Sequence, residues 1–217
     1  MQTTSQSLDQ LLKVSDKNRD EKWEDQFLQA FCDSKVQVLS PDPQNGPDNW
    51  PYLMVETSSN EVAKEPAQRI LEWLSTRGIG LVVNPQKDYP DFVMNFGMIW
   101  SFRKTGRFIH RVVPVATGEW TTETKLLKSG TPSEEYLPAF VRKILREFFR
   151  DQGVIAPKIL MISNDGVNFD LAFSLESLGS PPVSEQAGVA EAISWFLPGH
   201  YSLVLISERG LPAFEAL

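Results

Sequence analysis

The sequence predicts an α+β protein built from two similar helix–strand–strand–helix–strand units, with the helices packed on mixed sheets. Three observations support this fold class. Apolar residues recur at helical spacing in several segments, and short apolar or alternating runs of strand length lie between them. Clusters of proline, glycine and asparagine separate these segments. The order of the segments in the first half of the chain recurs in the second half.

Residues 1–20 are expected to form a polar N-terminal arm, and residues 21–128 the first α/β unit. Trp23 and Phe27 lie on one side of the first expected helix, and Gly78 is placed to end the second helix. The expected elements are a helix over 21–32, strands over 36–39 and 52–56, a helix over 67–77 and a strand over 79–83.

Residues 91–104 are rich in aromatic side chains and admit two interpretations. Asp91 is placed to cap a helix that Gly106 would end, and we expect this helix. A strand that leads into a turn at 104–106 stays open as the alternative. Residues 107–116 alternate and are rich in β-branched side chains, which predicts a strand.

Residues 129–217 are expected to form the second α/β unit, after a polar and turn-rich stretch. The triplet Asn164-Asp165-Gly166 predicts a hairpin turn between two strands. The expected elements are a helix over 134–151, strands over 158–162 and 168–174, a helix over 185–196 and a strand over 201–206.

Positions that match between the two halves predict an internal duplication. Trp73 corresponds to Trp195 and Leu81 to Leu203, both at a separation of 122 residues. The first helices and first strands match at the same separation, and the second strands need a small shift. The two halves are therefore expected to share one topology, whether they form one sheet or two.

The composition is that of an ordinary globular protein, with 41% hydrophobic and 23% charged residues among 217. The net charge of −7 argues against general nucleic-acid binding, which needs clustered lysine and arginine. No apolar run is long enough for a transmembrane helix, and residues 1–22 lack the apolar segment of a secretion signal. We therefore expect a cytoplasmic protein that does not bind membranes.

Residue types that carry catalysis or metal binding are few. Cys32 lies in an apolar helical pattern and is expected to be a buried thiol, and a single cysteine excludes an internal disulfide and a cysteine-rich zinc site. His110 and His200 lie on different elements, and Gly78-Ile79-Gly80 precedes a strand, whereas a dinucleotide-binding loop follows one. No metal or cofactor is predicted. A catalytic serine–histidine–aspartate set assembled from distant residues stays open.

The most basic segment of this acidic chain is the first candidate site. It contains Arg103, Arg107, His110 and Arg111. Such a segment predicts either a site for an anion or an acidic partner, or a solvated turn.

Tryptophans in polar loops are the second kind of candidate. Trp50 and Trp120 lie in such loops, where an indole can anchor a partner or close over the edge of the core. By contrast, the helical positions of Trp23, Trp73 and Trp195 predict core side chains.

Six short segments carry a family resemblance. They are FLQAFCDSKVQV at 27–38, GIGLVVNP at 78–85, GTPSEEYLP at 130–138, APKILMI at 156–162, FDLAF at 169–173 and LPGHYSLVL at 197–205. In this order they resemble the bacterial SseB family, which is named for enhanced serine sensitivity. The resemblance covers most of residues 22–210, and it implies two α/β units without established catalytic residues.

Three functions stay open from the sequence. The first is a non-enzymatic regulatory or protein-interaction protein, as the SseB-family resemblance and the surplus of aromatic residues indicate. The second is a binding partner such as a secretion chaperone or a toxin-neutralising protein. The third is a small-ligand-binding protein or an enzyme with its site near Arg103–Arg111. A protein partner is expected in the first two cases, and a homodimer stays open beside a monomer.

Overall fold

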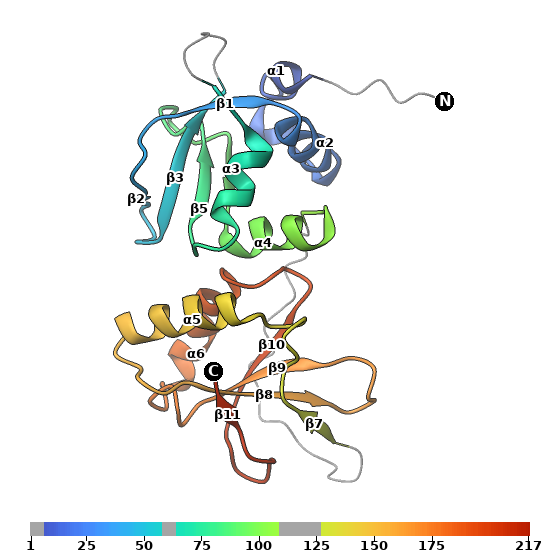
Figure 1. Cartoon of the computed structure of the whole chain (residues 1–217), viewed down its shortest axis with the longest axis vertical. Coiled ribbons are helices and arrows are strands. Elements are labelled where there is room, and N and C mark those ends of the chain that lie inside the picture. Colours follow the sequence, from blue (N-terminus) through green and yellow to red (C-terminus); the bar gives the residue numbers. More distant parts are fainter. Residues whose placement is uncertain (1–6, 58–63, 109–126) are drawn as a thin grey trace. The chain divides into compact units, whose positions relative to one another are not determined.

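A computed structural model describes residues 7–57, 64–108 and 127–217 of the chain (Figure 1). The chain divides into two compact units, Met1–Phe108 and Ile109–Leu217. This division lies earlier in the chain than the boundary expected between residues 128 and 129. Each unit contains helices and its own mixed sheet, so the predicted α+β class is confirmed.

The sheet of unit 1 has the strand order β4-β1-β3-β5-β6, and β2 also pairs with β3. β3 and β5 are parallel and are joined through helix α3, whereas the other pairs are antiparallel. A parallel pair needs such a crossover, because its strands must start at the same end of the sheet. The elements are β1 (Lys35–Val38), β2 (Gln44–Asn45), β3 (Pro51–Glu56), β4 (Glu65–Pro66), α3 (Ala67–Leu74), β5 (Gly80–Val83) and β6 (Phe92–Met94).

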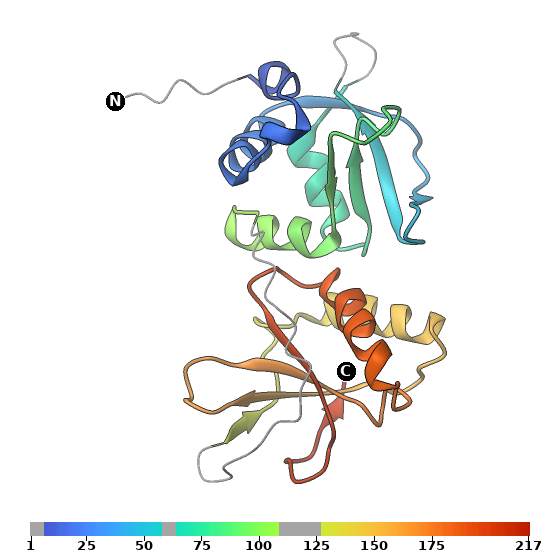
Figure 2. The same cartoon turned by 180° about the vertical axis from the view of Figure 1, so that it is seen from behind.

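The helices of unit 1 lie against its sheet (Figure 2), and most of their buried residues belong to one core cluster with residues of the strands. In α2 (Glu21–Cys32), Trp23 and Phe27 are buried as predicted, and their rings stack with centroids 5.0 Å apart. Alternate residues of β5, Leu81 and Val83, belong to the same core cluster. Alternate residues of the strand point to one face of the sheet, and on this face they pack against the apolar side of the helices.

The N-terminal residues described in the structure pack on this unit. Helix α1 (Leu8–Leu11) buries Leu11 completely, and a 3₁₀ turn (Asp16–Asn18) follows. The indole Nε1 of Trp23 donates to the carbonyl oxygen of Leu11 at 2.9 Å. Within the residues expected to be a polar arm, α1 is thus part of the unit 1 core.

A buried carboxylate fixes the end of this segment. The side chain of Asp91 is only 3% exposed. Arg19 Nη2 donates to its Oδ1 at 2.9 Å, and Asn84 Nδ2 donates to its Oδ2 at 2.7 Å. Lys87 Nζ donates to the same Oδ2 at 2.5 Å. Burial alone would raise the pKa of Asp91, but the hydrogen bonds from Lys87, Asn84 and Arg19 outweigh it and lower the pKa below its ordinary value.

The helix expected over 92–104 begins later than predicted. Strand β6 occupies Phe92–Met94, and helix α4 is Phe96–Thr105. Asn95 is the cap, because its Oδ1 accepts the backbone N–H of Met98 at 2.8 Å. Asp91 does not cap the helix, since its carboxylate is held by the contacts above. Gly106 ends α4 as predicted, with a φ of 71°.

The strand expected over 107–116 lies almost wholly outside the described residues. Arg107 and Phe108, which the structure describes, are not part of a strand. The ring of Phe108 instead stacks on Phe102 of α4, with centroids 4.3 Å apart. The chain therefore turns back against the end of α4 at this point.

Unit 2 has the strand order β10-β9-β8-β11, and β7 also pairs with β8. β9 and β10 are parallel and are joined through α6, whereas β8 is antiparallel to β9. The elements are β7 (Lys128–Gly130), α5 (Ala139–Asp151), β8 (Lys158–Ser163), β9 (Asp170–Ser174), α6 (Val183–Ser194), β10 (Ser202–Ile206) and β11 (Glu215–Ala216).

Helix α5 is shorter than the predicted helix over 134–151. Pro138 occupies the N-cap in an extended conformation, with φ −60° and ψ 154°. Proline lacks an N–H and disfavours a helical residue before it, so the helix begins at Ala139.

Both faces of the unit 2 sheet are apolar. On the helical face, the rings of Phe149 in α5 and Phe173 in β9 lie 5.8 Å apart. On the other face, Leu160, Ala172 and Val204 form a core cluster with Phe214 from the C-terminal segment. Burial on both faces explains why these strands are almost continuously apolar.

The two units share one topology. In each, a helix precedes an antiparallel pair of strands. A second helix then leads to a third strand, which is parallel to the second strand of the pair. Strands β5 and β10 begin at Gly80 and Ser202, which are 122 residues apart. The predicted helix–strand–strand–helix–strand units are therefore confirmed, and the duplication itself stays a prediction. Among the described residues, no helix combines the length and apolarity needed to cross a membrane.

Replacing Asp91 by asparagine is expected to lower the free energy of unfolding of unit 1 by about 3 kcal/mol, because Arg19 then loses its buried counter-charge. Because folding lowers the pKa of Asp91, the stabilisation is present above the unfolded pKa of about 3.9 and is lost as the pH falls through the folded value. Urea unfolding followed by tryptophan fluorescence at pH 7 and at decreasing pH measures both effects. The exposed Asp88→Asn in the same turn is the control and should change little. Equal stability of the two variants at pH 7 would contradict this assignment.

Candidate functional site

The structure describes three of the six residues predicted as site residues. His110, Arg111 and Trp120 lie outside the described residues. Arg103 lies in the last turn of α4, where its Nη1 donates to Ser75 Oγ at 2.8 Å. Because Ser75 is fully buried at the end of α3, this bond joins two helices of unit 1. Arg103 thus makes a contact within unit 1, and its predicted role in ligand binding stays a prediction.

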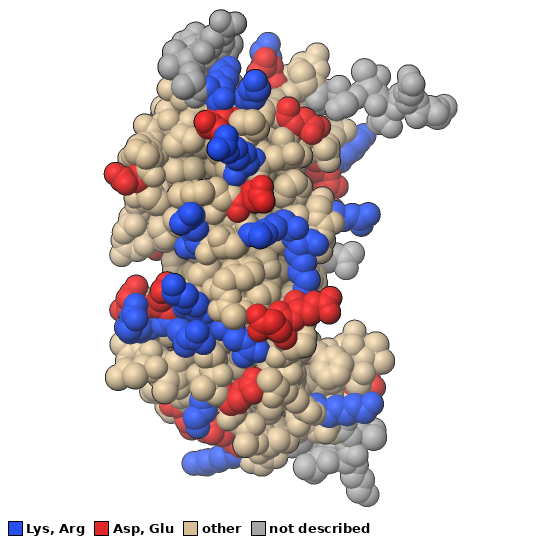
Figure 3. Space-filling model, viewed as in Figure 1, with Lys and Arg blue, Asp and Glu red and all other residues tan. Residues whose placement is uncertain are grey.

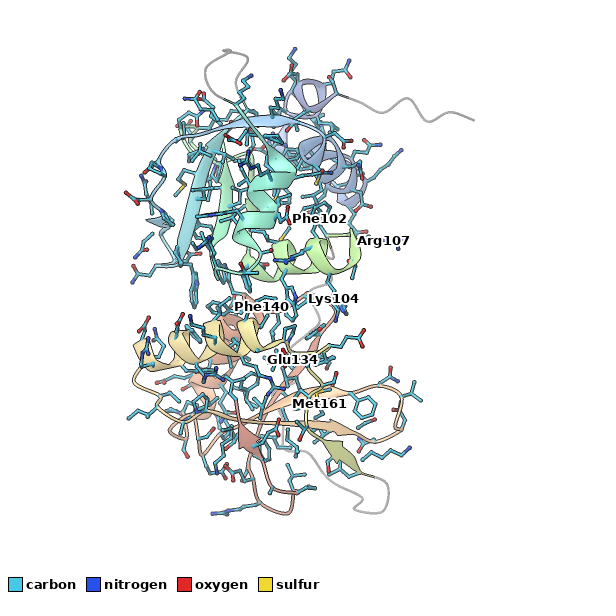
Figure 4. All side chains as sticks on the ribbon, in the orientation of Figure 1. Phe102, Lys104, Arg107, Glu134, Phe140 and Met161 are labelled. Atoms are coloured by element: carbon cyan, nitrogen blue, oxygen red, sulfur yellow. The ribbon has the colours of Figure 1, made fainter. Side chains whose placement is uncertain are left out.

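Arg107 and Trp50 are placed by local backbone contacts. The N–H of Arg107 donates to Thr105 Oγ1 at 3.2 Å, and its exposed side chain follows the end of α4 (Figure 4). Trp50 is half-buried in the turn before β3, and its N–H donates to Asp48 Oδ1 at 3.1 Å. Neither residue lines either of the two hollows described below.

A second basic surface lies on α5. On the face shown in Figure 3, lysine and arginine side chains gather over this helix. Several of them are engaged: Arg142 Nη2 donates to the carbonyl of Pro132 at 2.7 Å, and Arg146 Nη1 donates to that of Leu217 at 2.7 Å. The cations of α5 therefore tie neighbouring segments of unit 2 to the helix.

An apolar groove of about 290 Å³ lies on unit 1, and we name it the Trp73 groove. Its floor contains side chains of the core cluster, Leu53 and Ile70. Its rim carries Glu65 and Arg69, which form an ion pair at 3.5 Å with side chains 52% and 77% exposed. An ion pair this exposed contributes little to stability. The complete lining is Val38, Pro41, Leu53, Glu65, Arg69, Ile70 and Trp73.

Trp73 is not a core residue, contrary to the prediction. Its side chain is 42% exposed, because the indole stands at the edge of the buried stripe of α3, which consists of Ala67, Ile70, Leu71 and Leu74. The guanidinium carbon of Arg77 lies 4.2 Å from the indole centroid. This cation–π contact orients the ring at the groove. The arginine one turn after the tryptophan was the available sequence signal.

A more polar cleft of about 610 Å³ opens on unit 2 where β9 and β10 begin, and we name it the Tyr136 cleft. Three segments form it: the stretch from β7 to Tyr136, the β8–β9 hairpin and the start of β10. Met161 of β8 belongs to the lining (Figure 4), and it pairs with Gly130 of β7. The complete lining is Ser129, Gly130, Thr131, Pro132, Ser133, Tyr136, Met161, Val167, Asn168, Phe169, Asp170, His200, Tyr201 and Ser202.

A pair of tyrosines forms one wall of the cleft. The rings of Tyr136 and Tyr201 stack with centroids 4.2 Å apart, and the Tyr201 hydroxyl donates to the carbonyl oxygen of Tyr136 at 2.6 Å. Burial, and then the carboxylate of Glu135, raise the pKa of Tyr201 to about 12. Burial, and then the charges of Tyr201 and Asp170, raise the pKa of Tyr136 as well. Both hydroxyls are therefore neutral around pH 7.

The hairpin side of the cleft is held by Asp165. Its Oδ1 accepts the backbone N–H groups of Val167 and Asn168, each at 2.8 Å. These two bonds lower the pKa of Asp165 well below its ordinary value. Gly166 has a φ of 72°, which glycine adopts without strain, so the predicted turn at 164–166 is present. The turn presents Asn168 and Phe169 toward the cleft.

An activated cysteine and a metal-binding cluster are two features that often mark catalysis. Cys32 is 5% exposed, and burial together with the Asp33 carboxylate raises its pKa to about 12. The thiol is therefore buried as predicted and is not an activated nucleophile. In the described ranges, no three histidine, cysteine, aspartate or glutamate side chains lie close enough to hold a metal ion.

Comparison of the chain with protein-family models, with curated proteins and with solved structures finds no match. The resemblance to the SseB family therefore stays a prediction from the six sequence segments. The two hollows consequently have to be interpreted from their own chemistry.

Replacing Tyr201 by phenylalanine is expected to cost about 1–2 kcal/mol of stability, because the Tyr136 carbonyl loses its donor. Since folding raises the pKa of Tyr201, its stabilisation is complete below the unfolded value of about 10 and is lost as the pH rises toward 12. Urea unfolding at pH 7 and at alkaline pH tests both statements. In a tyrosinate absorbance titration, the variant should lose amplitude near pH 12. Tyr89→Phe, at a side chain 78% exposed, is the control; a loss of stability as large in this control would refute the assignment.

Proposed function

We propose that the protein is a non-enzymatic protein-interaction protein, as the SseB-family resemblance implies, and that it docks a partner in the Trp73 groove. One observation carries this proposal: a tryptophan expected in the core is 42% exposed and forms the wall of an apolar hollow. Tryptophan is the residue most enriched at energetically dominant positions of interfaces. Leaving it half in water is unfavourable unless a partner covers it.

The chemistry of the groove defines the partner segment. Val38, Leu53 and Ile70 offer an apolar floor, and about 290 Å³ holds one or two apolar side chains. Two exposed cations, Arg69 in the lining and Arg77 on the Trp73 ring, stand against Glu65, the one carboxylate of the lining. This balance favours a short apolar segment flanked by acidic residues. Such a segment would place its side chain against the indole and its carboxylates near the two arginines.

Truncation of Trp73 to alanine is expected to weaken partner binding at least about 30-fold, which is the loss typical of a central tryptophan. The tagged full-length protein and the variant are compared by affinity purification from the native cells and quantitative mass spectrometry. The result that supports the proposal is a companion lost with Trp73→Ala and kept with Tyr89→Ala, which removes an aromatic ring that is 78% exposed elsewhere on unit 1.

Charge reversal at the rim separates docking from a change of fold. Arg69→Glu leaves the indole in place and is expected to weaken binding of an acidic-flanked segment, more so at low salt. Urea unfolding of each variant shows whether unit 1 stays folded. Companions retained equally by all four proteins, with unit 1 intact, would refute docking at the Trp73 groove.

A further inference from the structure

The Tyr136 cleft on unit 2 has an unequal supply of hydrogen-bond donors and acceptors. The Ser202 hydroxyl donates to Asp170 Oδ1, and the Thr131 hydroxyl donates to Glu215 Oε2 at 2.8 Å. The Asn168 amide donates to Asp165 Oδ2 at 2.7 Å, and the Tyr201 hydroxyl is used by the Tyr136 carbonyl. These four donors are engaged by other groups of the protein. A ligand that needs these donors therefore finds them already in use.

The acceptors of the cleft are better placed for a ligand. Among the described residues, no donor is found for Asp170 Oδ2, the second oxygen of the carboxylate. Asn168 has its amide nitrogen turned toward Asp165, which leaves its carbonyl oxygen as an acceptor. No lysine or arginine belongs to the lining, and Asp170 is its one carboxylate. The cleft therefore favours a positively charged group with several N–H donors.

Aromatic faces add to this preference. Phe169 is 40% exposed and precedes Asp170 in the chain, and the stacked rings of Tyr136 and Tyr201 also belong to the lining. His200 is exposed, with its ring edge-on to Tyr201 at 4.8 Å between centroids. A cation over an aromatic face is attracted by the ring quadrupole, and the attraction grows where water is excluded.

We propose that the Tyr136 cleft binds a guanidinium group, with Asp170 as its counter-charge and Phe169 and the tyrosine pair as its aromatic walls. Guanidinium is planar, stacks on aromatic rings and is weakly hydrated, and it directs its donors in fixed directions toward oxygen acceptors. An ammonium group is more strongly hydrated and lacks the flat face. A cleft of about 610 Å³ holds an arginine side chain together with neighbouring atoms. This site is independent of the Trp73 groove, which lies on the other unit.

The test uses the isotope-labelled full chain and two neutral-backbone probes, N-acetyl-arginine amide and its uncharged analogue N-acetyl-citrulline amide. The arginine probe is expected to shift the amide NMR signals of residues 168–170 and 200–202. The citrulline probe should bind at least about tenfold more weakly, because its urea keeps the planar shape but replaces one NH2 group by a carbonyl oxygen and so lacks the charge and two N–H donors. Absence of shifts at these residues up to about 10 mM arginine probe, or equal binding of the two probes, would overturn the proposal.

Variants assign the contacts. Asp170→Asn is expected to weaken the arginine probe at least about tenfold, while its amide oxygen can still accept from Ser202. Asp151→Asn, at an exposed carboxylate that ends α5, is the control and should not change binding. Phe169→Leu keeps the bulk of the wall and removes its π face, so it should weaken the arginine probe several-fold. Unchanged binding in Asp170→Asn would refute the assigned counter-charge.

A second binding experiment, with an arginine-containing peptide, identifies the natural source of the guanidinium. If the amide Gly-Gly-Arg-Gly-Gly binds more tightly than N-acetyl-arginine amide, then backbone contacts add affinity and a protein segment is the source. If the two bind equally, then a free small cation is the source. Either result retains the guanidinium site, and neither depends on the outcome at Trp73.

Discussion

The carboxylate of Asp91 is the contact around which unit 1 is organised. A carboxylate that is 3% exposed is stable only when donors and positive charge replace the lost water. Arg19 supplies them from the N-terminal segment, and Lys87 and Asn84 from the turn after β5. Asn84 also accepts the backbone N–H of Thr57 at 2.9 Å, which extends the network to the end of β3. One side chain thus fixes the ends of both parallel strands and the segment that leads into α2.

In unit 2, a different carboxylate joins the ends of strands. Glu208, just after β10, accepts from Ser174 Oγ at 2.6 Å at the end of β9 and from Lys158 Nζ at 3.1 Å at the start of β8. In both units an acidic residue that follows the third strand of the shared topology is linked to the end of the second strand, through Asn84 in unit 1 and directly in unit 2, where it also binds the start of the first. The Glu208 side chain is 31% exposed, however, so solvent screens it far more than Asp91. We therefore expect unit 1 to depend more strongly on its carboxylate than unit 2 does.

Periodicity in the sequence was sufficient for the fold class and for most elements, because the helical stripes and the apolar strands are both long. It was insufficient where a short element was decided by distant contacts. β6 forms because it pairs with β5, and Asp91 is withdrawn from capping by Arg19, which lies 72 residues earlier. The two hollows were missed for a related reason. The spacing of Trp73 fits a core stripe, but the residue stands at the edge of that stripe, where Arg77 covers one face of its ring and 42% of the side chain is exposed.

The shared topology also explains why the Tyr136 cleft exists on one unit. In the parallel register, Ser202 stands beside Asp170 in unit 2, and Gly80 stands beside Tyr52 at the same place in unit 1. There the ring of Tyr52 lies over Gly80, since a Cβ on Gly80 would be 2.5 Å from Tyr52 Cδ1.

The ring of Tyr52, which is only 3% exposed, covers Gly80 and closes this end of the sheet in unit 1. A short carboxylate beside a serine leaves the same end open in unit 2. The cleft is therefore a consequence of two side-chain differences on a common backbone arrangement. If the halves arose by duplication, the second unit holds the proposed guanidinium site at the position that the first unit fills with its own side chain.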